Sequence, residues 1–143
     1  MKPSSDTDLL FVYGTLCRAS GNAAHRLLAD VAEFTGNGAV PGRLYQAEGF
    51  PVLVPDPQGV AVTGEVYRVF APQAAFLRLD QYEGFDPASP DTSEFRRDLV
   101  EVAMGDGRTV TAWAYIYQLP LFELRPIPHG DYARFLREST GGA

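Results

Sequence analysis

The stretch Leu9-Leu10-Phe11-Val12-Tyr13-Gly14-Thr15-Leu16 carries the strongest local signal for the fold. Its apolar run is too short for a helix and is typical of a buried β-strand that ends at Gly14. Glycine lets the backbone turn sharply, so the N–H groups from Tyr13 to Leu16 can face a cleft and bind an anion. The pattern matches neither GxGxxG nor a Walker A loop, which argues against a nucleotide site. An ordinary turn after a strand is the alternative interpretation.

Periodicity and turn residues predict the elements that follow this stretch. We expect, in order, a helix over 23–31, short strands joined by irregular backbone within 33–57, a strand over 59–70, a helix over 72–83, a loop over 84–94, a hairpin of strands 98–104 and 109–117, and a helix over 131–137. Strands dominate and do not alternate regularly with helices. The expected fold is therefore α+β, with a small mixed, barrel-like sheet and two or three short helices.

Length and composition narrow the class of protein. The 143 residues predict one domain over 1–143, with an ordered body at about 9–138. The formal net charge of −6 argues against nucleic acid and anionic membranes as partners. Met1 to Asp8 is polar and lacks the apolar core of a signal peptide, and the sequence has no run long enough to span a membrane, so we expect a cytoplasmic protein.

Glu83 is the carboxylate that helix geometry nominates for catalysis. Counted from Phe76, Leu79 at i+3 and Glu83 at i+7 share the face that should point toward the core, and Tyr82 extends its apolar side. Asp80 lies at the other edge, where exposure is easier, so we expect Glu83 to be the enclosed carboxylate. Burial and the helix C-terminus both raise the pKa of such a carboxyl, which suits a general acid or base. A surface pair with an arginine is the alternative.

The strand predicted over 109–117 has one apolar face and one amphipathic, aromatic face. The apolar side is built from Val, Ala and Ile, and the other side holds Thr109, Thr111, Trp113, Tyr115 and Tyr117. Tyr115 and Tyr117 are candidates for the wall of a ligand cavity, with hydroxyl groups available for binding. Packing in a core, with the hydroxyls satisfied at its rim, is the alternative.

Cys17 and the two histidines carry weaker signals. As the only cysteine, Cys17 excludes an internal disulfide and a zinc site built on paired cysteines. A thiol nucleophile would need a nearby base, for which His25 is the candidate, and a small buried thiol is the alternative. His25 and His129 lack a metal-ligand spacing, so we expect no metal.

The residues named above, taken in order, resemble the gamma-glutamylcyclotransferase-like family. Phe11 to Leu16 resembles its opening signature, Gly64-Glu65-Val66-Tyr67 its middle strand, and Leu79-Asp80-Gln81-Tyr82-Glu83-Gly84 the end of its catalytic helix. Ala112 to Tyr117 is similar to its last long strand and Ile127 to Tyr132 to its closing turn. The similarity covers residues 10–132.

The resemblance implies a small barrel-like fold whose cavity takes a gamma-glutamyl compound. In this family-based interpretation the turn Tyr13 to Leu16 grips the substrate and Glu83 is the acid/base. The α-amine attacks the side-chain amide and releases 5-oxoproline and an amine or amino acid, without cofactor, metal or nucleotide. The sequence departs from the family at Phe95, where relatives often carry Tyr, and this puts the substrate's identity in question. A noncatalytic module that binds a small metabolite on the same fold is the alternative function.

Overall fold

The computed structural model describes residues 7–18, 21, 23–47, 50–121 and 124–141. Its elements follow the order β1 (Leu9–Val12), α1 (His25–Ala29), β2 (Ala32–Ala47), β3 (Phe50–Pro55), β4 (Val60–Val69), α2 (Pro72–Glu83), the short 3-10 helix η2 (Pro90–Thr92), β5 (Phe95–Met104), β6 (Thr109–Tyr117), β7 (Arg125–Ile127) and α3 (Tyr132–Gly141). The α+β class is confirmed. In the described part of the chain, no helix is both long and apolar enough to cross a membrane.

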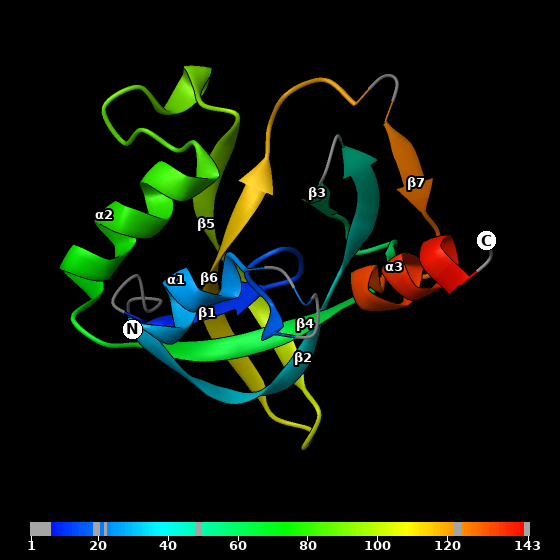
Figure 1. Ribbon diagram of the computed structural model, residues 1–143, viewed down its shortest axis with the longest axis horizontal. Helices are drawn as coiled ribbons and strands as arrows, with labels where there is room; N and C mark the ends of the chain where they lie inside the picture. The colour runs from blue at the N-terminus through cyan, green and yellow to red at the C-terminus, as the bar shows by residue number, and fades with distance from the viewer. Residues whose placement is uncertain (1–6, 19–20, 22, 48–49, 122–123, 142–143) are drawn as a thin grey trace.

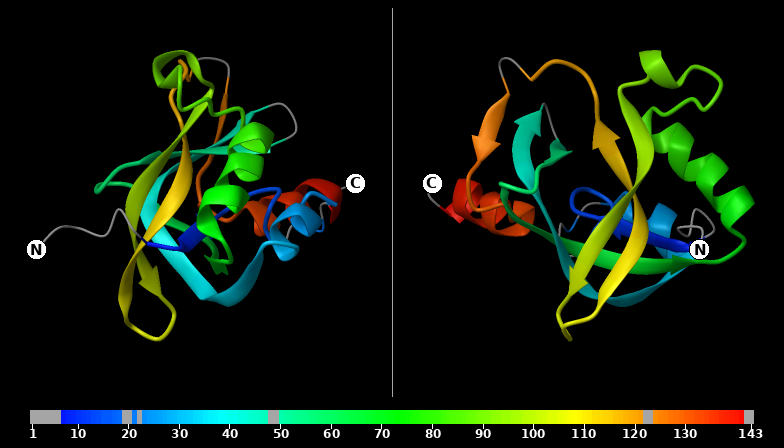
Figure 2. Two further views of the ribbon diagram at one scale, coloured as in Figure 1. Left: turned by 90° about the vertical axis from the view of Figure 1, so that its left-hand side faces the viewer. Right: turned by 180° about the vertical axis from the view of Figure 1, so that it is seen from behind.

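The strands form one mixed sheet that closes on itself. The order is β3-β2-β4-β1-β6-β5, and β2 also pairs with β5 at Gly38–Met104 and Ala39–Ala103, which makes a five-stranded barrel of β2, β4, β1, β6 and β5. β1 lies between β4 and β6, antiparallel to the first and parallel to the second. Helices α2 and α3 lie on opposite sides of this barrel (Figures 1 and 2). The predicted barrel-like sheet is confirmed.

The prediction for residues 33–57 is wrong in one respect. In place of short strands, one long strand, β2, pairs with β4, β3, β5 and β7 in turn. Its register shifts between Phe34 and Gly36, and such a bulge bends a strand and increases its twist. Glycine and proline, which suggested irregular backbone, here belong to a strand that curves around the barrel.

β1 is buried on both faces, as its apolar sequence predicts. Phe11 points into the barrel core, whereas Leu10 and Val12 pack in a second core with residues of the helices, among them Leu28 and Leu79. All of these side chains are less than 5% exposed. The end of β1, and with it the turn that follows, is therefore held from both sides.

The helices differ in how well the sequence predicted their bounds. α2 spans Pro72–Glu83 as predicted and ends at Gly84, whose positive φ of 75° favours glycine. α1 is only five residues long, shorter than the predicted 23–31, because the chain turns after it and enters β2 at Ala32. α3 extends the predicted 131–137 toward Gly141.

Candidate active site

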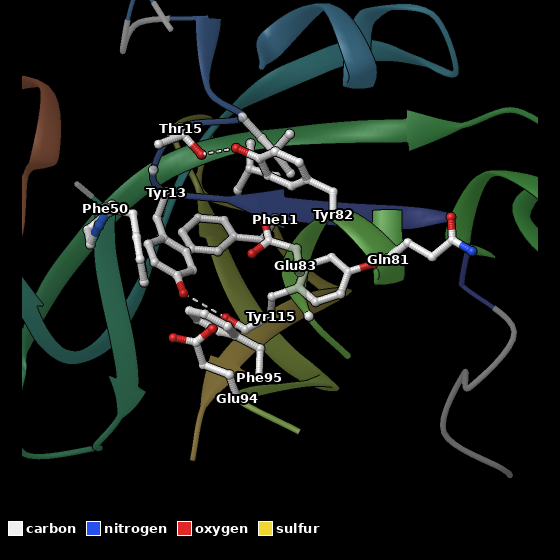
Figure 3. A pocket seen from close by; sticks show the side chains of 15 residues that line it. Phe11, Tyr13, Thr15, Phe50, Gln81, Tyr82, Glu83, Glu94, Phe95 and Tyr115 are labelled. Atoms are coloured by element: carbon white, nitrogen blue, oxygen red, sulfur yellow. Dashed lines mark hydrogen bonds between the residues drawn. The ribbon is translucent and has the colours of Figure 1, made fainter. Parts of the chain in front are cut away.

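A cavity of about 320 Å³ opens where β1 ends, beside the last turn of α2 (Figure 3). Its wall is built by the end of β1 and the turn after it, the start of β3, the end of α2, the start of β5 with the residue before it, and β6. The lining residues are Phe11, Val12, Tyr13, Gly14, Thr15, Leu16, Phe50, Pro51, Gln81, Tyr82, Glu83, Gly84, Glu94, Phe95 and Tyr115. The structure thus brings Glu83 and the whole Tyr13 to Leu16 turn into one site.

Glu83 contributes a carboxyl group to this cavity from the final turn of α2. The side chain is half-buried and lies among the aromatic rings of the wall (Figure 3). Burial, and to a smaller extent the nearby carboxylate of Glu94, raises the pKa of Glu83 from 4.5 to about 8. A carboxyl with such a pKa can both accept and return a proton near neutral pH.

The pKa of Glu83 makes stability depend on pH. The unfolded carboxyl ionises above about 4.5 and the folded one only above about 8, so the free energy of unfolding falls as the pH rises between these values. Because Gln stays neutral, we expect Glu83→Gln to be more stable than the parent by at least about 2 kcal/mol at pH 9 and nearly equal to it at pH 4. Urea unfolding at both pH values measures the difference.

The control for this measurement is Glu33→Gln, which removes an exposed carboxylate on β2 outside the cavity. It should show no such gain at pH 9. Equal stability of Glu83→Gln and the parent protein across this pH range would contradict the raised pKa.

Asp80 was predicted to be more exposed than Glu83, and this prediction is wrong. It is 4% exposed and accepts hydrogen bonds from the Tyr115 hydroxyl at 2.6 Å and from Nε of Arg97 at 2.9 Å. The Arg97 guanidinium lies over the rings of Phe76 and Trp113, 4.3 and 4.6 Å from their centroids. Side chains of β5 and β6 thus cover Asp80, and a helix considered alone does not reveal them.

Tyr115 connects both halves of the site. Its hydroxyl donates to Asp80, one turn before Glu83, and its backbone carbonyl accepts a 2.6 Å hydrogen bond from the hydroxyl of Tyr13. The Tyr13 hydroxyl also accepts from the backbone N–H of Leu53 at 3.3 Å. Burial raises the pKa of both tyrosines, so both remain neutral. These hydroxyls hold the wall together, and the rings face the cavity.

The turn after β1 is itself tightly built. The backbone N–H of Cys17 donates to the carbonyl of Gly14 at 3.0 Å, which places Thr15 and Leu16 at the tip. The hydroxyl groups of Thr15 and Tyr82 lie 2.8 Å apart and link the turn to α2 across the cavity (Figure 3). Tyr82, expected on the apolar side of the helix, is 44% exposed and forms the outer edge of the site.

The structure does not bring Tyr117 to the cavity. Two residues beyond Tyr115 on the same face of β6, it packs edge-on against Phe95 with ring centroids 5.4 Å apart. Phe95 is 4% exposed and does line the cavity, in contact with Phe50 as well. Sequence reasoning missed Phe50, Gln81 and Glu94, because nothing local in their segments shows that they meet the end of β1.

The arrangement around Cys17 does not favour a thiol nucleophile. Cys17 is 7% exposed, its Sγ donates to the carbonyl of Val12 at 3.2 Å, and burial raises its pKa well above the ordinary value. Nδ1 of His25 lies 2.8 Å from the carbonyl oxygen of Leu16. Within the described residues, no group of three or more His, Cys, Asp or Glu side chains is arranged to hold a metal.

Comparison with known proteins places this geometry in a family. A family model described as gamma-glutamyl cyclotransferase, AIG2-like, matches residues 10–134. The gamma-glutamylcyclotransferase family protein YtfP of Escherichia coli K12 is 31% identical over 124 residues, which make up 86% of this chain and 94% of YtfP.

Solved structures agree with that match. The solution structure of E. coli ytfP superposes with a TM-score of 0.61 at 30% identity and covers 87% of this chain and 95% of its own. An AIG2-like protein from Mus musculus gives a TM-score of 0.64 at 28% identity, with 87% of each chain covered. The predicted resemblance is confirmed: the chain belongs to the gamma-glutamyl cyclotransferase, AIG2-like family.

Proposed function

We propose that the protein is a gamma-glutamyl cyclotransferase that releases 5-oxoproline from a gamma-glutamyl amide. One observation carries the proposal: the Glu83 carboxyl, with a pKa near 8, shares a cavity with the Tyr13 to Leu16 turn. Family membership supports the same chemistry. The reaction needs a proton carrier and donors for negative charge, and these two elements supply them.

In the proposed mechanism Glu83 moves protons between two nitrogen atoms. Its carboxylate takes a proton from the substrate's α-ammonium, and the raised pKa of Glu83 makes it a stronger base than an ordinary carboxylate. The freed amine attacks the side-chain amide carbon, a new C–N bond closes the five-membered ring, and the bond to the leaving nitrogen breaks. Two protons leave the attacking nitrogen and two reach the leaving nitrogen, which departs as an ammonium, and Glu83 carries them one at a time.

The turn from Tyr13 to Leu16 has the complementary role in the proposal. Its backbone N–H groups hold the substrate carboxylate or the oxyanion that forms on the attacked carbonyl. Fixed donors matter here because the chain carries a net charge of −6, so its overall field repels an anionic group. The enclosed aromatic wall favours a curled substrate in which the amine already lies near the carbonyl.

A screen for 5-oxoproline tests the proposal. The purified protein is incubated with gamma-glutamyl dipeptides, gamma-glutamyl amines and glutathione, and 5-oxoproline is measured by chromatography. We expect release from at least one class of substrate. Saturable binding without release from any of them would overturn the proposal in favour of a noncatalytic binding protein. We also propose that the protein works in the cytoplasm, where its single cysteine would stay reduced.

A further inference from the structure

Two carboxyl groups, Glu83 and Glu94, line the cavity of the proposed active site (Figure 3). The two are close, since Oε1 of Glu94 lies 3.7 Å from the position that a Cβ on Gly84 would take. The described lining residues include no Arg, Lys or His. The cavity is therefore acidic, and the mechanism uses only one of its carboxyl groups.

The arginines that follow Glu94 in sequence are engaged elsewhere. Arg96 forms an exposed ion pair with Asp98, with Nε 2.9 Å from Oδ2. Arg97 pairs with Asp80, with Nε 2.9 Å from Oδ1. Glu94 lines the cavity, and none of the ion pairs among the described residues includes it.

The surroundings of Glu94 suit a positively charged group on the substrate. Phe95 follows it directly and packs against Phe50, with ring centroids 6.0 Å apart, and both rings line the cavity. Aromatic faces next to a carboxylate attract ammonium groups, and the partly enclosed site strengthens that attraction. A carboxylate on the substrate would be repelled by Glu94 if it lay beside these rings.

We propose that Glu94 is a specificity-determining residue that selects gamma-glutamyl amides whose leaving group carries a positive charge, such as a diamine, over those whose leaving group carries a carboxylate. The inference rests on the proposed function, because it assigns the leaving-group side of the same cavity. Glu83 meets the α-ammonium of the gamma-glutamyl group, and Glu94 meets the distal ammonium of the leaving amine.

Three substrates of matched length test this selection by charge. They are the gamma-glutamyl amides of 1,4-diaminobutane, n-butylamine and 4-aminobutyric acid, whose leaving groups end in a positive, a neutral and a negative group. We expect kcat/KM to fall in that order, with at least about 30-fold between the first and the last. Glu94→Gln should reduce this ratio to within about threefold, and Glu94→Lys should reverse the order.

Glu101→Gln is the matched control, because it removes the same charge from an exposed position on β5 outside the cavity. It should leave the ratio unchanged. If Glu94 acted only by raising the pKa of Glu83, its replacement would change all three substrates by the same factor, which would overturn the inference. Equal turnover of the three by the parent protein would also overturn it and would leave the proposed function intact. No 5-oxoproline from these three amides, with release from another substrate of the screen, would overturn the inference alone, and no release from any substrate would overturn both.

Discussion

Replacement of Glu83 by Gln is expected to lower 5-oxoproline release by about 100- to 10,000-fold. Gln keeps the size of the side chain but can neither accept the proton of the α-ammonium nor return one to the leaving nitrogen. Because the wall of the cavity is built by other residues, substrate binding should persist, so the loss should fall on kcat rather than on KM. Steady-state kinetics with the best substrate of the screen measure both values.

Two measurements keep this prediction separate from a folding defect. Glu83→Gln should retain a cooperative thermal transition, since Gln fills the space of the half-buried Glu83 side chain. Glu33→Gln, which changes the same residue type on the exposed face of β2, should keep full activity. A Glu83→Gln protein that retained more than a tenth of the parent kcat would show that another group carries the proton.

Replacement of Asp80 by Ala is expected to destabilise the protein by about 3–5 kcal/mol. The Arg97 guanidinium, which lies over the rings of Phe76 and Trp113 in a side chain only 18% exposed, would lose its counter-ion. The buried hydroxyl of Tyr115 would lose its hydrogen-bond acceptor. Most of the cost is the charge left without a partner. Urea unfolding at pH 7 measures the change.

A matched ion pair on the surface serves as the control. Asp98 pairs with Arg96 at the same distance, but both side chains are about half exposed, so Asp98→Ala should cost far less than Asp80→Ala. Tyr115→Phe removes one of the two partners and should fall between them. Similar effects of Asp80→Ala and Asp98→Ala would contradict the view that the Asp80 network holds α2 against β5 and β6.

Elements with strong local signals were predictable from sequence. The apolar run before Gly14 is a strand, and α2 begins at Pro72 and ends before Gly84, because proline and glycine act through the backbone of their own segment. The hairpin around 105–107 is in place for the same reason. β2 was missed because its Gly and Pro residues take a strand conformation only through pairing with four other strands.

The residues of the candidate site, too, could be predicted only where the signal was local. Helical spacing nominated Glu83, and a glycine after a buried strand nominated the turn from Tyr13 to Leu16; the structure places both in one cavity. Asp80 was predicted to be the more exposed carboxylate and is almost fully buried, because Arg97 and Tyr115 reach it from distant strands. Glu94 had no local signal at all.

The sequence by itself determined most of the helices and strands, which residue ends α2, and that Glu83 lies in its last turn, since all of these depend on interactions over a few residues. Only the tertiary structure decided what surrounds that carboxylate. Closure of the barrel brings the turn after β1, the end of α2 and the start of β5 together, and burial and charge are properties of that assembly. The pKa of Glu83 and the acidic character of its cavity therefore arise from contacts between residues far apart in the chain.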